Sequence, residues 1–127
     1  MALLVPTSAL IIDDEAHVRA YVKLLLGTLG VETFYEASNV EAARRLWAQY
    51  HPGLIMLDLN MPGESGLVLL NEVRAEDEET YIVILSSNAQ ASTVKEAAAA
   101  GADGFIRKDS PRDQVIAELT DIFDQPE

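Results

Sequence analysis

Acidic, hydroxyl and basic side chains follow four short apolar segments in the sequence of this 127-residue chain. In chain order they are Asp13 and Asp14, Asp58, Ser86 and Ser87, and Lys108. If the apolar segments are neighbouring parallel strands, their carboxyl ends share one edge of a sheet, where open α/β sheets bind their ligands. Three carboxylates, a hydroxyl group and a lysine would then meet in one crevice.

The charge of such a crevice indicates which ion it would hold. Two carboxylates about 4 Å apart, at an effective dielectric constant of about 20, repel by roughly 4 kcal/mol. Either protons or a cation must therefore balance the site. Three carboxylates and Lys108 leave two negative charges, which matches one divalent ion, and oxygen ligands favour magnesium over zinc. A carboxylate nucleophile, magnesium, a lysine and a hydroxyl group are typical of phosphoryl transfer.

The strands that must position these residues are indicated by hydropathy. Short runs of consecutive apolar residues are typical of strands covered on both faces of a parallel sheet. They span residues 9–12, 54–57, 81–85 and 105–106. A more polar fifth candidate, residues 32–36, is expected at an edge of the sheet.

Helical patterns alternate with these runs, which predicts five βα units and an open α/β sheet with helices on both faces. Gly30 is expected to end the first helix. Ser38 and Glu41 have the spacing of a capping box for the second helix. Ser110 is expected to cap the last helix, with Pro111 at its first position.

Length and composition narrow the function classes. With 13.9 kDa and 49% hydrophobic residues, the chain has the size and apolar content of one folded domain. Its net charge of −12 argues against direct nucleic-acid binding, which relies on Lys and Arg. There is no cysteine for a disulfide, no apolar run near the roughly 20 residues of a membrane span, and no signal-peptide pattern. We therefore expect a cytoplasmic domain that binds no membrane.

Several short motifs carry a resemblance to a known family. They are LIIDDE at residues 10–15, LDLNMPG at 57–63, Gly66, ILSS at 84–87 and GADGFIRK at 101–108. In this order and spacing, the chain resembles the receiver domain of two-component response regulators. The resemblance implies a flavodoxin-like, doubly wound, five-stranded parallel sheet of strand order 2-1-3-4-5, with five helices on both faces. It also implies a receiver domain over residues 8–124, terminal extensions at 1–7 and 125–127, and no output domain in this chain.

The resemblance gives each residue of the crevice a role. Asp58 would accept a phosphoryl group from the histidine of a sensor kinase or a phosphotransfer protein. The magnesium ligands would be Asp13, Asp14, Asp58 and the backbone carbonyl of Asn60. Lys108, Ser86 and Ser87 would contact the phosphoryl group, and Ser86 with Phe105 would form the switch.

The implied function is a phosphorylation-dependent signalling switch in a two-component system or phosphorelay. The chain would not be an enzyme beyond self-catalysed phosphotransfer and slow autodephosphorylation. The alanine-rich helix expected over residues 92–100 has little to bury, so its shift would need little free energy. Together with the strand of Phe105 and the last helix, it would form the face that binds a downstream protein. The sequence leaves open which downstream protein binds this face and whether an output domain lies outside this chain. It also leaves open whether phosphorylation drives the formation of a homodimer.

One position departs from the family pattern. Most members have a proline after the lysine, in a cis peptide bond, whereas Lys108 is followed by Asp109. A cis bond to another residue type costs about 2.5–4 kcal/mol, which leaves this conformation open. The run at 108–111 is similar to the branch whose members carry a C-terminal helix-turn-helix domain. The chain is therefore either a single-domain regulator or a part of a longer one.

Three other functions would use a similar pattern. A magnesium-dependent phosphohydrolase needs a second aspartate two residues after its nucleophile, where this chain has Asn60, which cannot act as the general acid. A flavodoxin-like electron carrier needs a glycine- and hydroxyl-rich loop after the first strand, where Asp13, Asp14 and Glu15 would repel a flavin phosphate. A receiver that has lost signalling would only mediate assembly, which the intact site residues disfavour.

Each residue also has a purely structural explanation. Asp13 and Asp14 are of the type that caps a helix N-terminus. Asp58 suits a turn, Lys108 suits a surface ion pair, and Phe105 is a core residue by type. The joint arrangement of all of them favours the functional interpretation.

Overall fold

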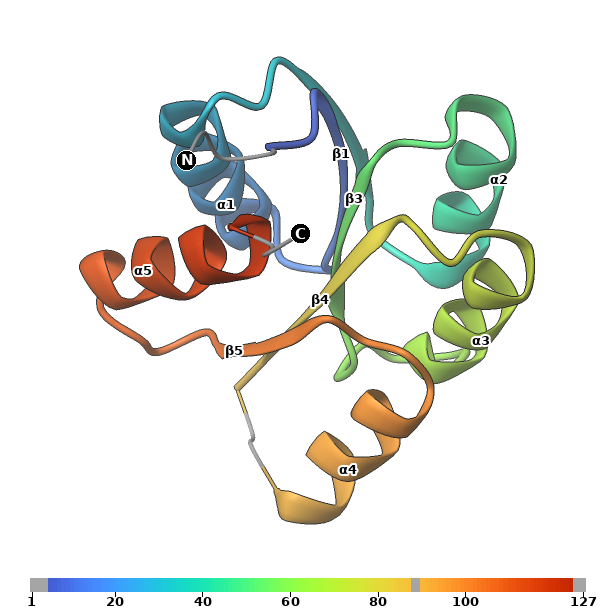
Figure 1. Ribbon diagram of the computed structural model, residues 1–127. Coiled ribbons are helices and arrows are strands. Elements are labelled where there is room, and N and C mark those ends of the chain that lie inside the picture. The colour runs from blue at the N-terminus through green and yellow to red at the C-terminus, as the bar shows by residue number, and fades with distance from the viewer. Residues whose placement is uncertain (1–4, 88–89, 125–127) are drawn as a thin grey trace.

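The computed structural model describes residues 5–87 and 90–124, in which strands and helices alternate along the chain (Figure 1). The strands are β1 (Ser8–Ile12), β2 (Thr33–Ala37), β3 (Leu54–Asp58), β4 (Tyr81–Ser86) and β5 (Gly104–Arg107). The helices are α1 (Ala16–Leu29), α2 (Val40–Tyr50), α3 (Gly66–Glu76), α4 (Ala91–Ala99) and α5 (Arg112–Phe123). None of these helices is long and apolar enough to cross a membrane. The extensions expected at the two ends lie outside the described residues, apart from residues 5–7.

The strands form one parallel sheet in the order β2-β1-β3-β4-β5. This confirms the predicted doubly wound, flavodoxin-like topology. From β1 the chain first adds β2 on one side and then β3 on the other. The carboxyl ends of β1 and β3 therefore flank the point where the winding reverses, which is where α/β sheets bind ligands. The predicted edge strand is β2, and it is more exposed than β3, the other neighbour of β1.

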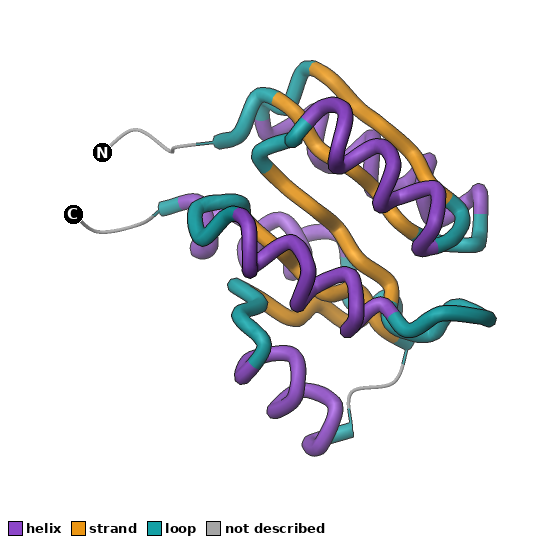
Figure 2. The backbone as a smooth tube through the Cα atoms, turned by 90° about the vertical axis from the view of Figure 1, so that its right-hand side faces the viewer, coloured by secondary structure: helices purple, strands orange, loops and turns teal. Residues whose placement is uncertain are grey.

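Helices cover both faces of the sheet, as the two views show (Figures 1 and 2). Because successive strand side chains point to opposite faces, each central strand contributes to two cores. Leu10 and Ile55 pack on the side of α2, α3 and α4, whereas Ile11 and Met56 pack on the side of α1 and α5. Burial on both faces explains why the central strands are apolar throughout.

The N-caps of two helices lie one residue later than predicted, whereas one helix ends where it was predicted to end. Helix α1 ends as predicted at Gly30, whose φ of 111° favours glycine. Helix α2 is capped by Asn39 and not by Ser38: the Asn39 side chain accepts a hydrogen bond of 2.7 Å from the Ala42 amide. Helix α5 begins at Arg112 with proline itself at the N-cap, so the predicted serine cap was wrong.

Helix α4 is the shortest helix, and Ala97 is its one fully buried residue, as its alanine-rich sequence predicts. Its C-terminal end is held by Arg74 of α3. The Arg74 guanidinium donates hydrogen bonds to the carbonyl of Gly101 (2.8 Å), the carbonyl of Thr80 (2.6 Å) and the carboxylate of Asp103 (2.7 Å). The helix is thus fixed at one end and lightly packed along its length.

Candidate functional site

The predicted crevice residues all lie at the carboxyl edge of the sheet. Asp13 directly follows β1, and Asp58 is the last residue of β3, the neighbouring strand. Ser86 ends β4, and Lys108 directly follows β5. The glycine at position 66 lets α3 begin close by, because a Cβ atom there would lie 3.2 Å from the Asp58 carbonyl oxygen.

The three aspartates form an acid cluster, by which we mean Asp13, Asp14 and Asp58. One carboxylate oxygen from each lies within 4.8 Å of the others. Asp13 and Asp58 are 0% and 1% exposed, whereas Asp14 is exposed. The predicted convergence of carboxylates is therefore confirmed, and the cluster opens to solvent on the Asp14 side.

Lys108 neutralises part of this cluster. Its Nζ lies 2.8 Å from Asp13 Oδ2 and 3.0 Å from Asp58 Oδ2, and its side chain is only 14% exposed. Its backbone amide donates a hydrogen bond of 2.9 Å to the carbonyl of Ser86, which aligns the residue with the end of β4. A third carboxylate, Glu15, lies 3.5 Å from Nζ. This contact of Glu15 was not predicted from the sequence, although the place of Glu15 directly after the aspartate pair was a signal.

Burial and neighbouring charges together shift the pKa values of Asp58 and Lys108. Removal from water raises the pKa of Asp58, while the Asn60 backbone amide and Lys108 oppose that rise and the Asp13 charge adds to it. Burial alone would lower the pKa of Lys108, but its contacts with Asp13 and Asp58 outweigh burial and raise it above its ordinary value. The lysine is therefore charged at neutral pH, and the carboxylate of Asp58 is held at some expense in free energy.

The cluster has the features of a magnesium site. Asp13 Oδ2 is buried, and Lys108 Nζ lies 2.8 Å from it in an ion pair that lacks regular hydrogen-bond geometry. A buried carboxylate oxygen that accepts no well-formed hydrogen bond is uncommon in folded proteins and is a candidate ligand for a cation. The available ligands are all oxygen atoms, which suits a hard divalent cation such as Mg²⁺. Within residues 5–87 and 90–124, no other group of three acidic, histidine or cysteine side chains has this spacing.

Asn60 connects the cluster to the hydroxyl group. Its backbone amide donates a hydrogen bond of 2.8 Å to Asp58 Oδ1, and its side-chain amide donates one of 2.8 Å to the hydroxyl of Ser86. Ser86 is fully buried, whereas Ser87 is exposed. This side-chain bond was not predicted from the sequence, which indicated a backbone carbonyl ligand at Asn60 and an amide that cannot act as a general acid.

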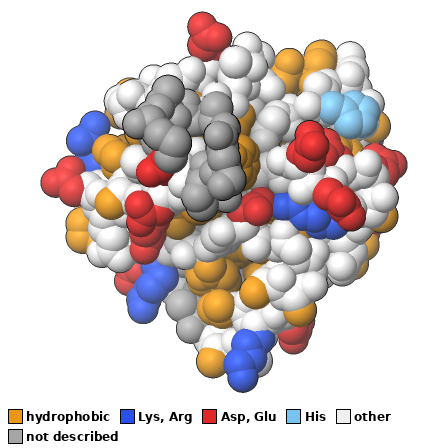
Figure 3. Space-filling model, viewed as in Figure 1, with side chains coloured by type: hydrophobic (Ala, Val, Ile, Leu, Met, Phe, Trp, Pro, Cys, Tyr) orange, Lys and Arg blue, Asp and Glu red, His pale blue; other side chains and the backbone are white. Residues whose placement is uncertain are grey.

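Phe105 lies away from the cluster, on the α4 side of the sheet. It is half-buried and lines a groove between α4 and β5, where apolar side chains reach the surface (Figure 3). The bond from Lys108 to Asp109 is trans, since the described residues contain no cis peptide bond. Asp109 instead pairs with Arg107 at 2.9 Å. Without a proline after the lysine, this peptide bond therefore takes the trans form.

Comparisons with known proteins agree on one family. A sequence model of the response regulator receiver domain matches residues 9–120. The chain is 35% identical to the chemotaxis protein CheY of Bacillus subtilis over 110 residues, which are 87% of this chain and 92% of that protein. It is 36% identical to the nitrate/nitrite response regulator NarL of Escherichia coli over 115 residues, which are 90% of this chain and 53% of that protein.

A solved structure shows the same likeness. The signal receiver domain of a response regulator NarL from Mycobacterium tuberculosis superposes with a TM-score of 0.82 at 27% identity. The match covers 94% of this chain and 98% of that one. The chain thus spans nearly all of a receiver domain or a CheY, and about half of a full-length NarL.

Proposed function

Because the chain belongs to the response regulator receiver domain family, we propose that it is a phosphorylation switch in which Asp58 accepts the phosphoryl group. One observation supports this assignment above the others. Asp58 is the buried carboxylate at the end of β3, with Asp13 just after the neighbouring strand β1 and Lys108 Nζ 3.0 Å from its Oδ2. Asp58 thus lies at the end of a central strand, between the other carboxylates of the cluster and the lysine that balances them.

We propose that the acid cluster and the backbone carbonyl of Asn60 hold Mg²⁺. When bound, the ion would supply positive charge next to the oxygens of the transferring group. Two features support this assignment. The buried Asp13 oxygen accepts no well-formed hydrogen bond beside its ion pair with Lys108, and the exposed position of Asp14 gives access from solvent.

Phosphotransfer itself needs little from the protein beyond position and charge. An oxygen of Asp58 forms a bond to phosphorus while the bond from phosphorus to the donor's imidazole nitrogen breaks, and the electron pair stays on that nitrogen. Lys108 exchanges its contact with Asp58 for one with a phosphoryl oxygen, so its charge remains paired. The donor would be the phosphohistidine of a sensor kinase or of a phosphotransfer protein.

The switch follows from the contacts of the buried hydroxyl. We propose that the Ser86 hydroxyl turns toward the phosphoryl group, with Ser87 beside it, and gives up its bond from Asn60. Phe105 would then move inward from its half-buried position, and the lightly packed α4 would shift with it. The α4-β5-α5 face would carry the signal to a downstream protein or an output domain, in the cytoplasm.

The phosphohydrolase alternative is disfavoured by the same contacts. A general acid two residues after Asp58 would have to protonate a leaving group, but Asn60 has an amide that carries no titratable proton. That amide already donates to Ser86. We therefore propose a regulator that is phosphorylated once rather than an enzyme that turns over phosphomonoesters.

The test is intact-mass measurement after treatment with acetyl phosphate, with and without Mg²⁺. We expect the wild type to gain one phosphoryl group when Mg²⁺ is present and Asp58→Asn to gain none. Asp109→Asn is the matched control, because this exposed carboxylate pairs with Arg107 outside the cluster, and it should behave as the wild type. Equal phosphorylation of Asp58→Asn would contradict the assignment.

A further inference from the structure

The guanidinium of Arg19, in the first turn of α1, contacts the backbone of the acid cluster. Its Nη1 donates a hydrogen bond of 2.6 Å to the carbonyl oxygen of Asp13. Its Nε donates one of 3.1 Å to Oε1 of Glu36 on β2. The Arg19 side chain is only 18% exposed, so the bond to the Asp13 carbonyl is partly shielded from water. The receiver function proposed above gives this arginine no role.

The carbonyl that Arg19 holds belongs to the peptide unit between two carboxylates of the cluster. A peptide unit is planar, so the direction of the Asp13 carbonyl also fixes the plane that joins the Cα atoms of Asp13 and Asp14. Asp13 lies just beyond the end of β1. A hydrogen bond from a charged donor is roughly twice as strong as a neutral one. Arg19 therefore restrains a peptide unit that the strand itself no longer contains.

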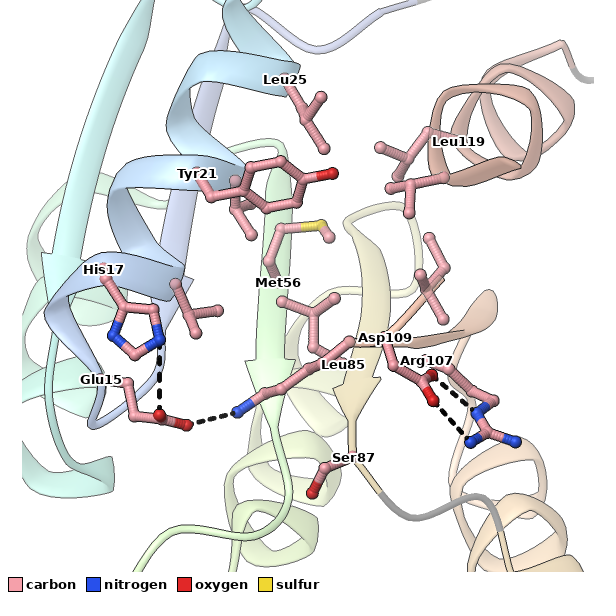
Figure 4. Close-up of a pocket in the computed structure, with 15 residues that line it drawn as sticks. Glu15, His17, Tyr21, Leu25, Met56, Leu85, Ser87, Arg107, Asp109 and Leu119 are labelled. Atoms are coloured by element: carbon pink, nitrogen blue, oxygen red, sulfur yellow. Dashed lines mark hydrogen bonds and ion pairs between the residues drawn. The ribbon is translucent and has the colours of Figure 1, made fainter. Parts of the chain in front are cut away.

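The other polar groups of Asp13 are held as well. Its amide donates a hydrogen bond of 3.1 Å to the carbonyl of Ala37, the last residue of β2. Its Oδ1 accepts one of 2.8 Å from the Glu15 amide, and its Oδ2 lies 2.8 Å from Lys108 Nζ. The Glu15 side chain extends toward that same Nζ and the His17 ring, at 3.5 and 3.6 Å (Figure 4). Asp13 is thus oriented by contacts from several elements, of which α1 supplies the guanidinium.

Position rather than charge is what Arg19 contributes to the cluster. Its ion pair with Glu36 balances the positive charge of the guanidinium locally. A guanidinium is planar and its donors point in fixed directions, so bonds to β2 and to the Asp13 carbonyl together hold it in one place. If Arg19 acted through its charge, it would weaken the binding of a cation, and its removal would tighten that binding. Positioning predicts the opposite sign.

We propose that Arg19 is a positioning residue for Mg²⁺, because it holds the peptide unit between Asp13 and Asp14 and so sets the directions of two carboxylates of the cluster. This inference rests on the Mg²⁺ assignment proposed above. Mg²⁺ demands nearly ideal octahedral geometry at short ligand distances, so a turned carboxylate costs affinity. Loss of a residue that orients metal ligands typically weakens metal binding by about 10–100-fold.

Mn²⁺ alone, a paramagnetic substitute for Mg²⁺, tests the inference on the full chain. The electron paramagnetic resonance signal of free Mn²⁺ gives the dissociation constant without any phosphorylation. We expect Arg19→Met, which keeps an apolar stem but no donor, to raise this constant at least about tenfold. Glu36→Ala frees one end of the guanidinium and should raise it about threefold. Because Glu36 is exposed, this second variant keeps the test valid if Arg19→Met does not fold.

Arg74→Met is the matched control for lost stability. Arg74 also binds backbone and carboxylate oxygens, but it does so beside the amino ends of β4 and β5, at the opposite edge of the sheet. Its removal should leave the Mn²⁺ dissociation constant unchanged. The metal-free protein gives a second signature, because the Glu15 amide bonds to Asp13 Oδ1. Exchange of this amide should speed up at least about tenfold in Arg19→Met and not in Arg74→Met.

The possible failures can be told apart. If the wild type binds Mn²⁺ and is phosphorylated, but Arg19→Met and Glu36→Ala bind Mn²⁺ as tightly, the inference is wrong and the proposed function stands. Tighter binding by Arg19→Met would also overturn the inference, because Arg19 would then act through its charge. Equal losses in Arg19→Met and Arg74→Met would do the same, since general stability would explain both. A wild type that binds no Mn²⁺ would overturn both the inference and the metal assignment.

Discussion

The side-chain amide of Asn60 donates a hydrogen bond of 2.8 Å to the hydroxyl of Ser86. The two residues lie 26 positions apart in sequence and meet because β3 and β4 are adjacent strands. The bond holds the buried hydroxyl at the acid cluster before any phosphoryl group arrives. It is the contact that the proposed switch must exchange.

Removing this amide should destabilise the protein slightly. A hydrogen bond to a buried hydroxyl contributes about 1 kcal/mol, so Asn60→Ala should lower the free energy of unfolding by about that amount. Asn71→Ala is the matched control, because Asn71 donates a bond of 3.0 Å to the Leu67 carbonyl on the exposed side of α3. Urea denaturation should show a change within about 0.5 kcal/mol for the control. Equal losses in both variants would argue against a special role for the Asn60 bond.

Neutralising Asp58 should stabilise the folded protein in the absence of Mg²⁺. Burial raises the folded-state pKa of Asp58 above its unfolded value, so its carboxylate form lowers stability once the pH exceeds both values. Asp58→Asn should therefore have a higher urea midpoint than the wild type at pH 7. The difference should shrink as the pH falls through the raised pKa, because the wild-type carboxyl then becomes neutral. A lower midpoint for Asp58→Asn at pH 7 would show that the Lys108 contact outweighs burial.

Magnesium should raise the stability of the wild type. A ligand at ten times its dissociation constant stabilises the folded state by about 1.4 kcal/mol. We expect this gain in thermal unfolding with Mg²⁺ and its loss after addition of EDTA. Asp13→Asn removes a carboxylate whose buried oxygen has no hydrogen bond, and it should abolish most of the gain. Asp109→Asn should keep it, and an equal loss in both variants would place the ion elsewhere.

The Arg74 contacts should carry a large share of the stability around α4. Arg74→Met leaves the Gly101 and Thr80 carbonyls and the Asp103 carboxylate without their shared donor. We expect unfolding free energy to fall by about 3 kcal/mol and amide exchange in α4 to speed up. Arg45→Met removes only an exposed pair with Glu41, so its effect should stay within about 0.5 kcal/mol. Similar losses in the two variants would show that the Arg74 contacts add little.

The sheet and the acid cluster could be predicted because both follow from simple patterns. Consecutive apolar residues indicate strands buried on two faces, and parallel strands bring their carboxyl ends to one edge. Asp13, Asp58 and Lys108 follow such runs, so their convergence needed no knowledge of side-chain directions. The strand order came from the family resemblance, because hydropathy alone does not rank neighbouring strands.

Features that depend on side-chain direction were missed or misplaced. The Asn60–Ser86 bond and the Glu15–Lys108 contact join groups that are far apart in sequence. The N-cap of α2 was predicted one residue too early, at Ser38 instead of Asn39, because both are good N-caps and backbone geometry selects between them. Sequence spacing identifies a cap only to within a residue.

The most direct measurement of the central claim locates the phosphoryl group within the chain. The wild type is treated with acetyl phosphate and Mg²⁺, then reduced with sodium borohydride, which converts an aspartyl phosphate to homoserine. Trypsin separates residues 1–19, which contain Asp13 and Asp14, from residues 46–74, which contain Asp58. We predict homoserine at position 58 alone. Homoserine at position 13 or 14, or an unmodified peptide 46–74 from phosphorylated protein, would contradict the account.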